Sequence, residues 1–462
     1  MKEFDAIVIG AGQAGIPLAK KLAKSGMTVA LIEKRMVGGT CINDGCTPTK
    51  TLVASARMAY LARTQSAKLG VDISSFELNF EHIMARKNAI VAQFRAGSIK
   101  GLEAIDNLTL IYGEAKFISD KVIAVNSSTG DVATYTAKNI MINTGCSPVI
   151  PNIEGVHEIE FLTSTTILEL KEVPKHLLIV GGGYIGLEFG QMFSRFGSEV
   201  TIIEHSDRLL PHEDEDVCGV MTELFREEGV EVITQAKVTG FEKYGPDRIR
   251  VRYEGSDGMQ TTMCTHVLLA SGRKPQTDQL GLENTGITAD DHGFIHVDDY
   301  LRTQVEGVFA LGDVKGGPAF THISYNDHLL VADFLIRGER ESIKGRLVPY
   351  CMFTDPQIGR IGITEEQAIE QKLDYLVAKL PMKNVARAIE TGETRGFMKA
   401  VVDKQTKLIL GATIIGEQGG EIMTVLQMAM MGKITYSQVR FAIFAHPLYA
   451  ESLNNLFMSL DA

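Results

Sequence analysis

Several features that mark particular classes of protein are missing from this sequence of 462 residues. No apolar run reaches the roughly 18 residues that a membrane-spanning helix needs, and we expect no secretory signal before the first short apolar strand. Basic residues are not in excess: 46 Lys and Arg stand against 57 Asp and Glu, and the net charge is -11. We therefore expect a cytoplasmic protein whose main partner is neither nucleic acid nor a membrane.

Cysteine is also scarce, and six cysteines in a chain of this length are not a disulfide framework. Four of them are far apart in or beside apolar stretches, and we interpret them as small buried hydrophobic residues: Cys146, Cys218, Cys264 and Cys351. The other two, Cys41 and Cys46, lie close together among glycines. These two are the candidates for chemistry.

The remaining composition is that of a globular protein of about three domains, with 45% hydrophobic and 22% charged residues. A βαβ pattern begins with an apolar strand over residues 6–9 and a G-x-G-x-x-G turn at Gly10, Gly12 and Gly15. A helix and a second strand follow, and that strand ends at Glu33. Such glycines let the backbone approach a pyrophosphate, and the acid can hold ribose hydroxyls.

The same pattern returns after a strand over residues 176–180. Its turn is Gly181-Gly182-Gly183-Tyr184-Ile185-Gly186. In both copies the acid, here Glu204, lies 18 residues after the third glycine. One such turn alone is often only structural, but two complete units predict two dinucleotide sites.

Three further apolar strands end at Thr144-Gly145, Ser271-Gly272 and Gly312-Asp313. The first two strand endings mark passages between domains. The candidate cofactor contacts among these residues are Thr144, Gly145, Gly272, Gly312 and Asp313. An acid at the position of Asp313 could reach the sugar-like chain of a flavin.

The segment over residues 38–50 contains both candidate cysteines. Residues 43–45 favour a tight turn that brings the sulfurs within bonding distance, and Pro48 suits the first turn of a helix that runs on through residues 51–63. Cys46 then lies near a helix N-terminus, which favours a thiolate. A zinc half-site lacks a second ligand cluster, and a structural disulfide is out of place in a reducing compartment, so redox catalysis is favoured.

Near the C-terminus, His446 and Glu451 stand five residues apart, and Pro447 places the histidine just before a helix. Histidine is suited to shuttle a thiol proton, and a carboxylate on its other nitrogen fixes the tautomer. By itself a His-Pro pair of this kind is more often structural.

Together these motifs resemble the flavoprotein disulfide reductases, the family of lipoamide dehydrogenase, glutathione reductase and mercuric reductase. The resemblance covers essentially the whole chain. It implies an α/β fold with two Rossmann-like dinucleotide-binding domains, one inserted in the other, plus a C-terminal α+β dimerisation domain, and it implies a homodimer. The expected bounds are 1–150 (FAD-binding), 151–273 (NAD(P)-binding), 274–345 (second part of the FAD-binding or central domain) and 346–462 (dimerisation).

The resemblance also implies roles for single residues. Cys46 would be the charge-transfer thiol beside the flavin, Cys41 the interchange thiol that attacks the substrate, and Lys50 would lie near the flavin N5 and pair with Glu188. His446 and Glu451 would reach the cysteines of the other subunit. The remaining expected contacts to FAD are Gly10, Gly12, Gly15, Glu33, Gly39, Thr40, Thr144, Gly145, Gly312, Asp313 and His322. Those to the nicotinamide nucleotide are Gly181, Gly183, Tyr184, Ile185, Gly186, Glu204 and Gly272.

Glu204 favours NAD(H) over NADP(H), because a carboxylate repels the 2′-phosphate; Arg208 nearby would soften this. Residues 45–50 and 353–356 look more like the mercuric-reductase branch. The chain nevertheless ends without that branch's cysteine pair and keeps His446 where those enzymes usually have Tyr. We therefore expect a dithiol or disulfide substrate, small or protein-bound, as for dihydrolipoamide dehydrogenase. The alternatives are a reductase of Hg(II) or Cu(II) and a non-enzymatic flavin-bearing subunit; no metal site is expected.

Overall fold

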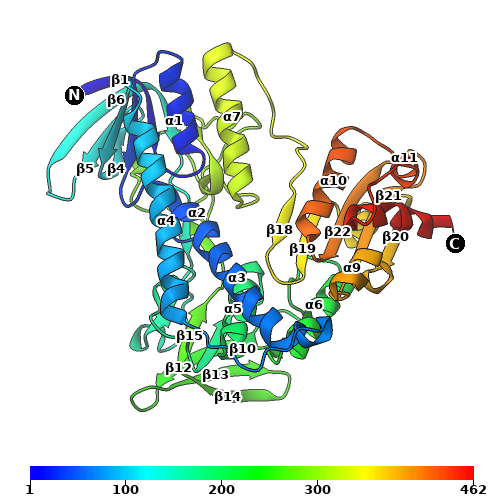
Figure 1. Ribbon diagram of the computed structural model, residues 1–462. Helices are drawn as coiled ribbons and strands as arrows, with labels where there is room; N and C mark the ends of the chain where they lie inside the picture. Colours follow the sequence, from blue (N-terminus) through cyan, green and yellow to red (C-terminus); the bar gives the residue numbers. More distant parts are fainter. Residues whose placement is uncertain (462) are drawn as a thin grey trace. The chain divides into compact units, whose positions relative to one another are not determined.

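The computed structural model describes residues 1–461, which form two compact units (Figure 1). Each unit is assembled from three separate stretches of the chain. Unit 1 comprises Met1–Thr51, Met84–Val149 and Gly272–Arg346. Unit 2 comprises Leu52–Ile83, Ile150–Ser271 and Leu347–Ala462, of which Ala462 lies outside the described residues.

A seven-stranded sheet forms the centre of unit 1, in the order β3-β2-β1-β6-β5-β4 with β17 also paired to β6. Its strands are β1 (Lys2–Ile9), β2 (Val29–Glu33), β3 (Leu108–Tyr112), β4 (Glu114–Ser119), β5 (Val122–Asn126), β6 (Val132–Ile142) and β17 (Val308–Ala310). β1, β2, β3, β6 and β17 are parallel, whereas β4 and β5 extend the sheet as an antiparallel meander.

The two faces of this sheet are covered differently, because successive side chains of a strand point to opposite sides. Val8 and Leu31 belong to a core shared with α1 (Gly15–Lys24) and α7 (Thr321–Arg337), which lie side by side in Figure 1. Ile7 and Ile32 point the other way and pack with β4, β5 and the segment over residues 280–295. Both faces are therefore buried, as parallel strands require.

Helices α2 (Gly39–Asn43), α3 (Cys46–Tyr60) and α4 (Phe80–Glu103) follow β2, and a single π turn over Leu61–Gln65 continues α3. β7 (Cys146–Pro148) pairs with β16 (Arg273–Pro275) as a two-stranded sheet. The helix after the cysteines thus begins at Cys46, so that Pro48 lies in its first turn as predicted.

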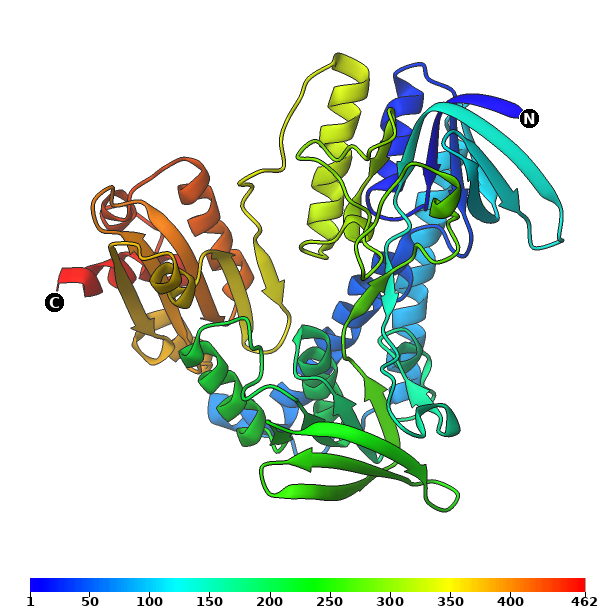
Figure 2. The same ribbon diagram turned by 180° about the vertical axis from the view of Figure 1, so that it is seen from behind.

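Unit 2 contains a second parallel sheet, in the order β11-β10-β9-β15-β8. The strands are β8 (Phe161–Leu162), β9 (His176–Val180), β10 (Glu199–Ile203), β11 (Glu231–Ile233) and β15 (His266–Leu269). Helices α5 (Tyr184–Phe196) and α6 (Glu215–Glu227) connect its strands. An antiparallel sheet of β12 (Lys237–Lys243), β13 (Ile249–Gly255) and β14 (Gly258–Cys264), green in Figure 2, shares a core with the parallel sheet.

The C-terminal part of unit 2 is an antiparallel sheet in the order β18-β19-β22-β21-β20. Its strands are β18 (Tyr350–Met352), β19 (Gln357–Gly362), β20 (Tyr375–Pro381), β21 (Phe397–Asp403) and β22 (Ile409–Gly416). Its helices are α8 (Glu365–Glu370), α9 (Ala386–Thr391), α10 (Gly419–Met431), α11 (Tyr436–Arg440) and α12 (Ser452–Met458). The core of this sheet includes Leu426 of α10 and Leu456 of α12.

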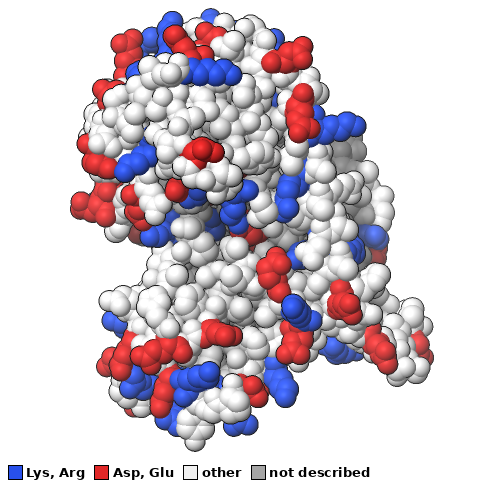
Figure 3. All heavy atoms as spheres, turned by 90° about the vertical axis from the view of Figure 1, so that its left-hand side faces the viewer, with Lys and Arg blue, Asp and Glu red and all other residues white. Residues whose placement is uncertain are grey.

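The fold class expected from the sequence is confirmed, with two βαβ dinucleotide units and a C-terminal α+β part. Among the described residues, no helix is both long and apolar enough to cross a bilayer. Basic and acidic side chains are interspersed over the face of the molecule in Figure 3.

Three of the four cysteines interpreted as core residues are buried, and burial raises the pKa of Cys146, Cys218 and Cys264 to about 12. Cys351 differs from that interpretation, because it is only half-buried.

Candidate active site

The cysteine pair of unit 1 lies where two helices meet. Cys41 is in α2, and Cys46 is the first residue of α3. Gly45 lies between them and allows this close approach, since a Cβ on it would stand 2.8 Å from the carbonyl oxygen of Thr40. Neither cysteine forms a disulfide in the structure; Cys46 is exposed and Cys41 is half-buried. The hydrogen bond between them, together with burial, raises the pKa of Cys41 well above its ordinary value.

A hydroxyl from a distant part of the chain completes the surroundings of the thiols. Thr321, the first residue of α7, places its Oγ1 3.6 Å from Cys46 Sγ. Next to it, the ring of His322 stacks on Phe320 at a centroid distance of 5.4 Å. The sequence interpretation singled out His322 and missed Thr321, because a lone threonine 275 residues from Cys46 carries no pattern.

The first glycine turn, between β1 and α1, contacts the cysteine segment directly. The backbone N–H of Gly38 donates to the carbonyl oxygen of Ala11 at 2.8 Å. A Cβ on Gly39 would stand 2.7 Å from Gly12 Cα. Gly10 has a φ of +103°, and a Cβ on it would strike the carbonyl oxygen of Asn143 at 2.3 Å. The glycines are therefore required by backbone contacts within unit 1.

Glu33 fixes the shape of that turn. Its carboxylate is buried and accepts hydrogen bonds from the backbone N–H groups of Ala11 and Arg35, each at 2.8 Å. The carboxylate retains further lone pairs for hydroxyl donors.

The residues around this turn fit a dinucleotide with a polar, flavin-like end. Thr144 Oγ1 is buried without a hydrogen-bond partner in the structure, and nothing lies within 4 Å of a Cβ built on Gly145. Burial raises the pKa of the Asp313 carboxyl. The N–H of the adjacent Gly312 donates to Asp327 at 2.9 Å. The unpartnered hydroxyl of Thr144, the open space at Gly145 and the raised pKa of Asp313 are typical of a binding site rather than of a closed core.

The second glycine turn, between β9 and α5 in unit 2, repeats the first in detail. Glu204 is buried and accepts from the N–H groups of Gly182 at 2.5 Å and Ser206 at 2.8 Å. Glu33 makes the same pair of contacts in unit 1. A Cβ on Gly186 would strike the carbonyl oxygen of Gly181 at 2.1 Å, as one on Gly15 would strike Gly10 at 2.0 Å.

Gly183 differs from these glycines, because nothing lies within 4 Å of its Cβ position. The next residue, Tyr184, begins α5 and donates its hydroxyl to Glu213 at 3.2 Å.

Arg208 pairs with another glutamate, although the sequence made it a candidate to soften the preference for NAD(H). Its guanidinium bonds both carboxylate oxygens of Glu366, at 3.0 and 3.1 Å. The exposed ring of His205 instead contacts Glu204, with Nδ1 2.8 Å from Oε1.

Lys50 and Glu188 belong to different units, and their pairing stays a prediction. Lys50 is half-buried in α3. Glu188 is buried in α5 and accepts the backbone N–H of Phe353 at 2.8 Å. The remaining predicted contacts, Thr40, Ile185 and Gly272, lie in α2, in α5 and directly before β16.

The structure brings His446 and Glu451 together in unit 2. His446 Nδ1 lies 2.9 Å from one oxygen of Glu451 and 3.2 Å from the other. The His446 side chain is 70% exposed. Among residues 1–461, no group of three or more His, Cys, Asp or Glu side chains is arranged to hold a metal ion.

The family models decide the identification. The pyridine nucleotide-disulphide oxidoreductase model matches residues 4–327, and the dimerisation-domain model of the same family matches residues 348–457. The chain belongs to the pyridine nucleotide-disulphide oxidoreductase family. It is a flavoprotein disulfide oxidoreductase that uses a pyridine nucleotide.

Similar members of this family span the whole chain. The probable pyridine nucleotide-disulfide oxidoreductase RclA of Escherichia coli is 39% identical over 99% of both chains. A dihydrolipoyl dehydrogenase of Geobacillus stearothermophilus is 35% identical over 97% of this chain and 94% of its own. A mercuric reductase of Streptomyces lividans is 33% identical over the same shares of the two chains. A solved Cu(II) complex of RclA superimposes with a TM-score of 0.90 and covers 99% of both chains.

Proposed function

We propose that this oxidoreductase transfers electrons between NAD(H) and a dithiol or disulfide substrate through Cys41 and Cys46. The observation that carries the proposal is the pair of hydrogen-bonded thiols at the start of α3, in contact with a dinucleotide-binding glycine turn. FAD, when bound, supplies the two-electron relay between the nicotinamide and the Cys41–Cys46 disulfide.

In the reducing direction, the Cys41 thiolate attacks one sulfur of the substrate disulfide, and the other substrate sulfur leaves as a thiolate. His446 of the second subunit, held by Glu451, gives that thiolate a proton. The Cys46 thiolate then attacks the Cys41 sulfur of the mixed disulfide, which re-forms the Cys41–Cys46 disulfide and releases the second substrate sulfur as a thiolate. The reverse sequence oxidises a dithiol and yields NADH.

The preference for NADH is also part of the proposal. It is supported by the buried Glu204 carboxylate and by the engagement of Arg208 with Glu366. Glu204 repels a 2′-phosphate, and Arg208 is already paired with another carboxylate.

A homodimer is proposed because residues 348–457 match a dimerisation domain and because large apolar side chains are exposed there. Phe441 is 78% and Ile443 101% exposed, a few residues before His446. A partner that covers them would also bring His446 to the opposite cysteines. The cytoplasmic location and the domain bounds expected from the sequence belong to the same proposal.

A second candidate function is reduction of a thiol-bound metal ion, Cu(II) or Hg(II). It is favoured by one specific finding, the Cu(II) complex of RclA at 39% identity, and by the similarity to mercuric reductases. The two thiols would then bind the metal ion as substrate.

A steady-state panel tests both functions. Purified holoenzyme is assayed with NADH and NADPH against lipoamide, glutathione disulfide, Cu(II) and Hg(II). Fastest turnover with NADH and a disulfide, lowered at least about 100-fold by Cys41→Ser, supports the first function. Faster NADH consumption with Cu(II) or Hg(II) than with any disulfide favours the second, and negligible turnover with every acceptor contradicts both.

A further inference from the structure

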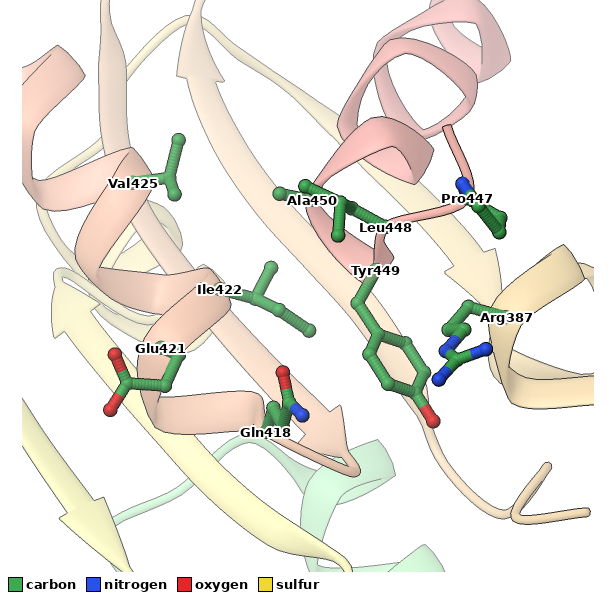
Figure 4. Close-up of a pocket in the computed structure, with 9 residues that line it drawn as sticks. All are labelled: Arg387, Gln418, Glu421, Ile422, Val425, Pro447, Leu448, Tyr449 and Ala450. Atoms are coloured by element: carbon green, nitrogen blue, oxygen red, sulfur yellow. The ribbon is translucent and has the colours of Figure 1, made fainter. Parts of the chain in front are cut away.

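The four residues that separate His446 from Glu451 have a pocket, rather than packed side chains, on one side. A pocket of about 430 Å³ lies between residues 447–450 and α10, whose Ile422 and Val425 line the opposite wall (Figure 4). Leu448 is exposed, and Pro447 and Ala450 are half-buried. Apolar packing alone therefore does not fix this segment.

Tyr449 is the one buried side chain of the segment and anchors it on the other side. Its hydroxyl donates to Glu417 Oε2 at 2.6 Å and lies 2.7 Å from Thr391 Oγ1. Burial and the hydrogen bond to Glu417 raise the pKa of Tyr449.

The anchor continues into the helix that follows the cysteines. Arg57 of α3 donates from Nη2 to Glu417 Oε1 at 2.6 Å and pairs through Nη1 with Asp355. Asp355 in turn accepts from Arg195 Nη1 at 2.7 Å. Glu417 thus joins Tyr449 to a network of largely buried ion pairs, in which charged hydrogen bonds are directional and strong.

We propose that Tyr449, Glu417 and Arg57 are positioning residues that hold residues 447–450, and thereby the His446–Glu451 pair, in place for proton transfer. The inference rests on the proposed role of His446. It assigns these three residues no contact with substrate or cofactor. A displacement of about 1 Å at a reacting group can slow a step about 100-fold.

Rapid-mixing absorbance measurements on the holoenzyme test this by separating the two half-reactions. Tyr449→Phe removes only the hydroxyl and is expected to slow reoxidation of the reduced enzyme by lipoamide about 10-fold or more. Reduction by NADH is expected to stay within about twofold of wild type. Glu417→Gln keeps a hydrogen-bond acceptor for Tyr449, so it is expected to slow reoxidation less than Glu417→Ala does.

Tyr436→Phe is the matched control, because the Tyr436 ring packs on Phe457 and its hydroxyl has no hydrogen-bond partner among residues 1–461. His446→Gln is the reference for the histidine itself. If His446→Gln slows reoxidation and Tyr449→Phe does not, the positioning role is wrong and the proposed function stands. If His446→Gln leaves reoxidation unchanged, the positioning role falls because the proposed role of His446 has failed. Equal slowing of both half-reactions by Tyr449→Phe would show a merely structural role.

Discussion

Cys41 and Cys46 differ in what surrounds their sulfur atoms, and we propose that this difference gives them different roles. Cys46 is the first residue of α3, where the helix dipole favours a thiolate. Cys41 is less exposed and is hydrogen-bonded to Cys46, which raises its pKa. We therefore expect the thiolate of the reduced pair on Cys46 rather than on Cys41.

Removal of Cys46 is predicted to lower the pKa of Cys41. The hydrogen bond to Cys46 is the largest cause of the raised pKa, so the Cys41 thiolate fraction at a given pH should rise in Cys46→Ala. The measurement is the pH dependence of iodoacetamide alkylation at Cys41, located by mass spectrometry, in this variant and in the reduced wild type. A midpoint that moves to higher pH in Cys46→Ala would contradict the assignment.

Glu204→Ala is predicted to reduce the preference for NADH. A hydrogen bond to a charged group contributes about 1.5–3 kcal/mol, so the ratio of kcat/KM for NADH to that for NADPH should fall about 10- to 100-fold. Glu366→Ala is a useful companion, since it frees Arg208 from Glu366 and should raise kcat/KM for NADPH but not for NADH. An unchanged ratio in Glu204→Ala would show that another residue selects the nucleotide.

The site residues that could be predicted from the sequence are those that lie a few positions from a recognisable motif. Cys41, Cys46, Glu33 and Glu204 each follow a glycine turn or a strand end at short range. Thr321 and Tyr449 were missed because each comes into its role through contacts with distant parts of the chain, and neither residue type signals chemistry by itself.

At the scale of elements, the two glycine turns are held in shape by equivalent contacts. In each, the first glycine has a positive φ, the third lies against the carbonyl oxygen of the first, and a buried glutamate holds the second residue. Internal backbone contacts and hydrogen bonds therefore hold each strand–turn–helix unit in shape, which lowers the entropic cost of binding a ligand.

Gly183→Ala is predicted to weaken binding of the nicotinamide nucleotide without disturbing the fold. Its φ of -85° suits alanine and no atom lies near its Cβ position, so the methyl group would intrude only on a bound pyrophosphate. We expect the KM for NADH to rise about 10-fold or more with unchanged flavin content. Gly219→Ala in α6, also with open space around it, is the control. An unchanged KM in Gly183→Ala would place the pyrophosphate elsewhere.

Elements built from continuous apolar runs were predictable, and β1, β2, β9, β10 and β17 lie where the sequence indicates. The meander β4–β5 and the sheet β12–β14 were not predicted. Their strands are half-exposed, with patterns such as alternating buried and partly buried residues in β13, and such alternation gives a weaker signal than a buried run.

At the scale of the whole molecule, the active site is proposed to need two chains. The apolar residues exposed in unit 2 before His446 are more than a monomer would leave to solvent in one segment. The partner that covers them is, in this account, a second copy.

Ile443→Asp is predicted to produce monomers, because it places a charge in the interface. Light scattering after size exclusion should give twice the mass of one chain for wild type and a single chain for the variant. Lipoamide turnover should be lost with the dimer, while NADH reduction of the flavin persists. Ile118→Asp, at an exposed position of β4, should remain dimeric. A wild-type protein that is monomeric and fully active would overturn the two-chain site.

Anaerobic titration with NADH tests the central claim, that the Cys46 thiolate lies against the flavin and exchanges electrons with it. Two-electron reduction of the wild type should produce a long-wavelength absorbance band, and Cys46→Ser should lack it. A wild-type protein that shows no such band, or a band that persists in Cys46→Ser, would contradict the account.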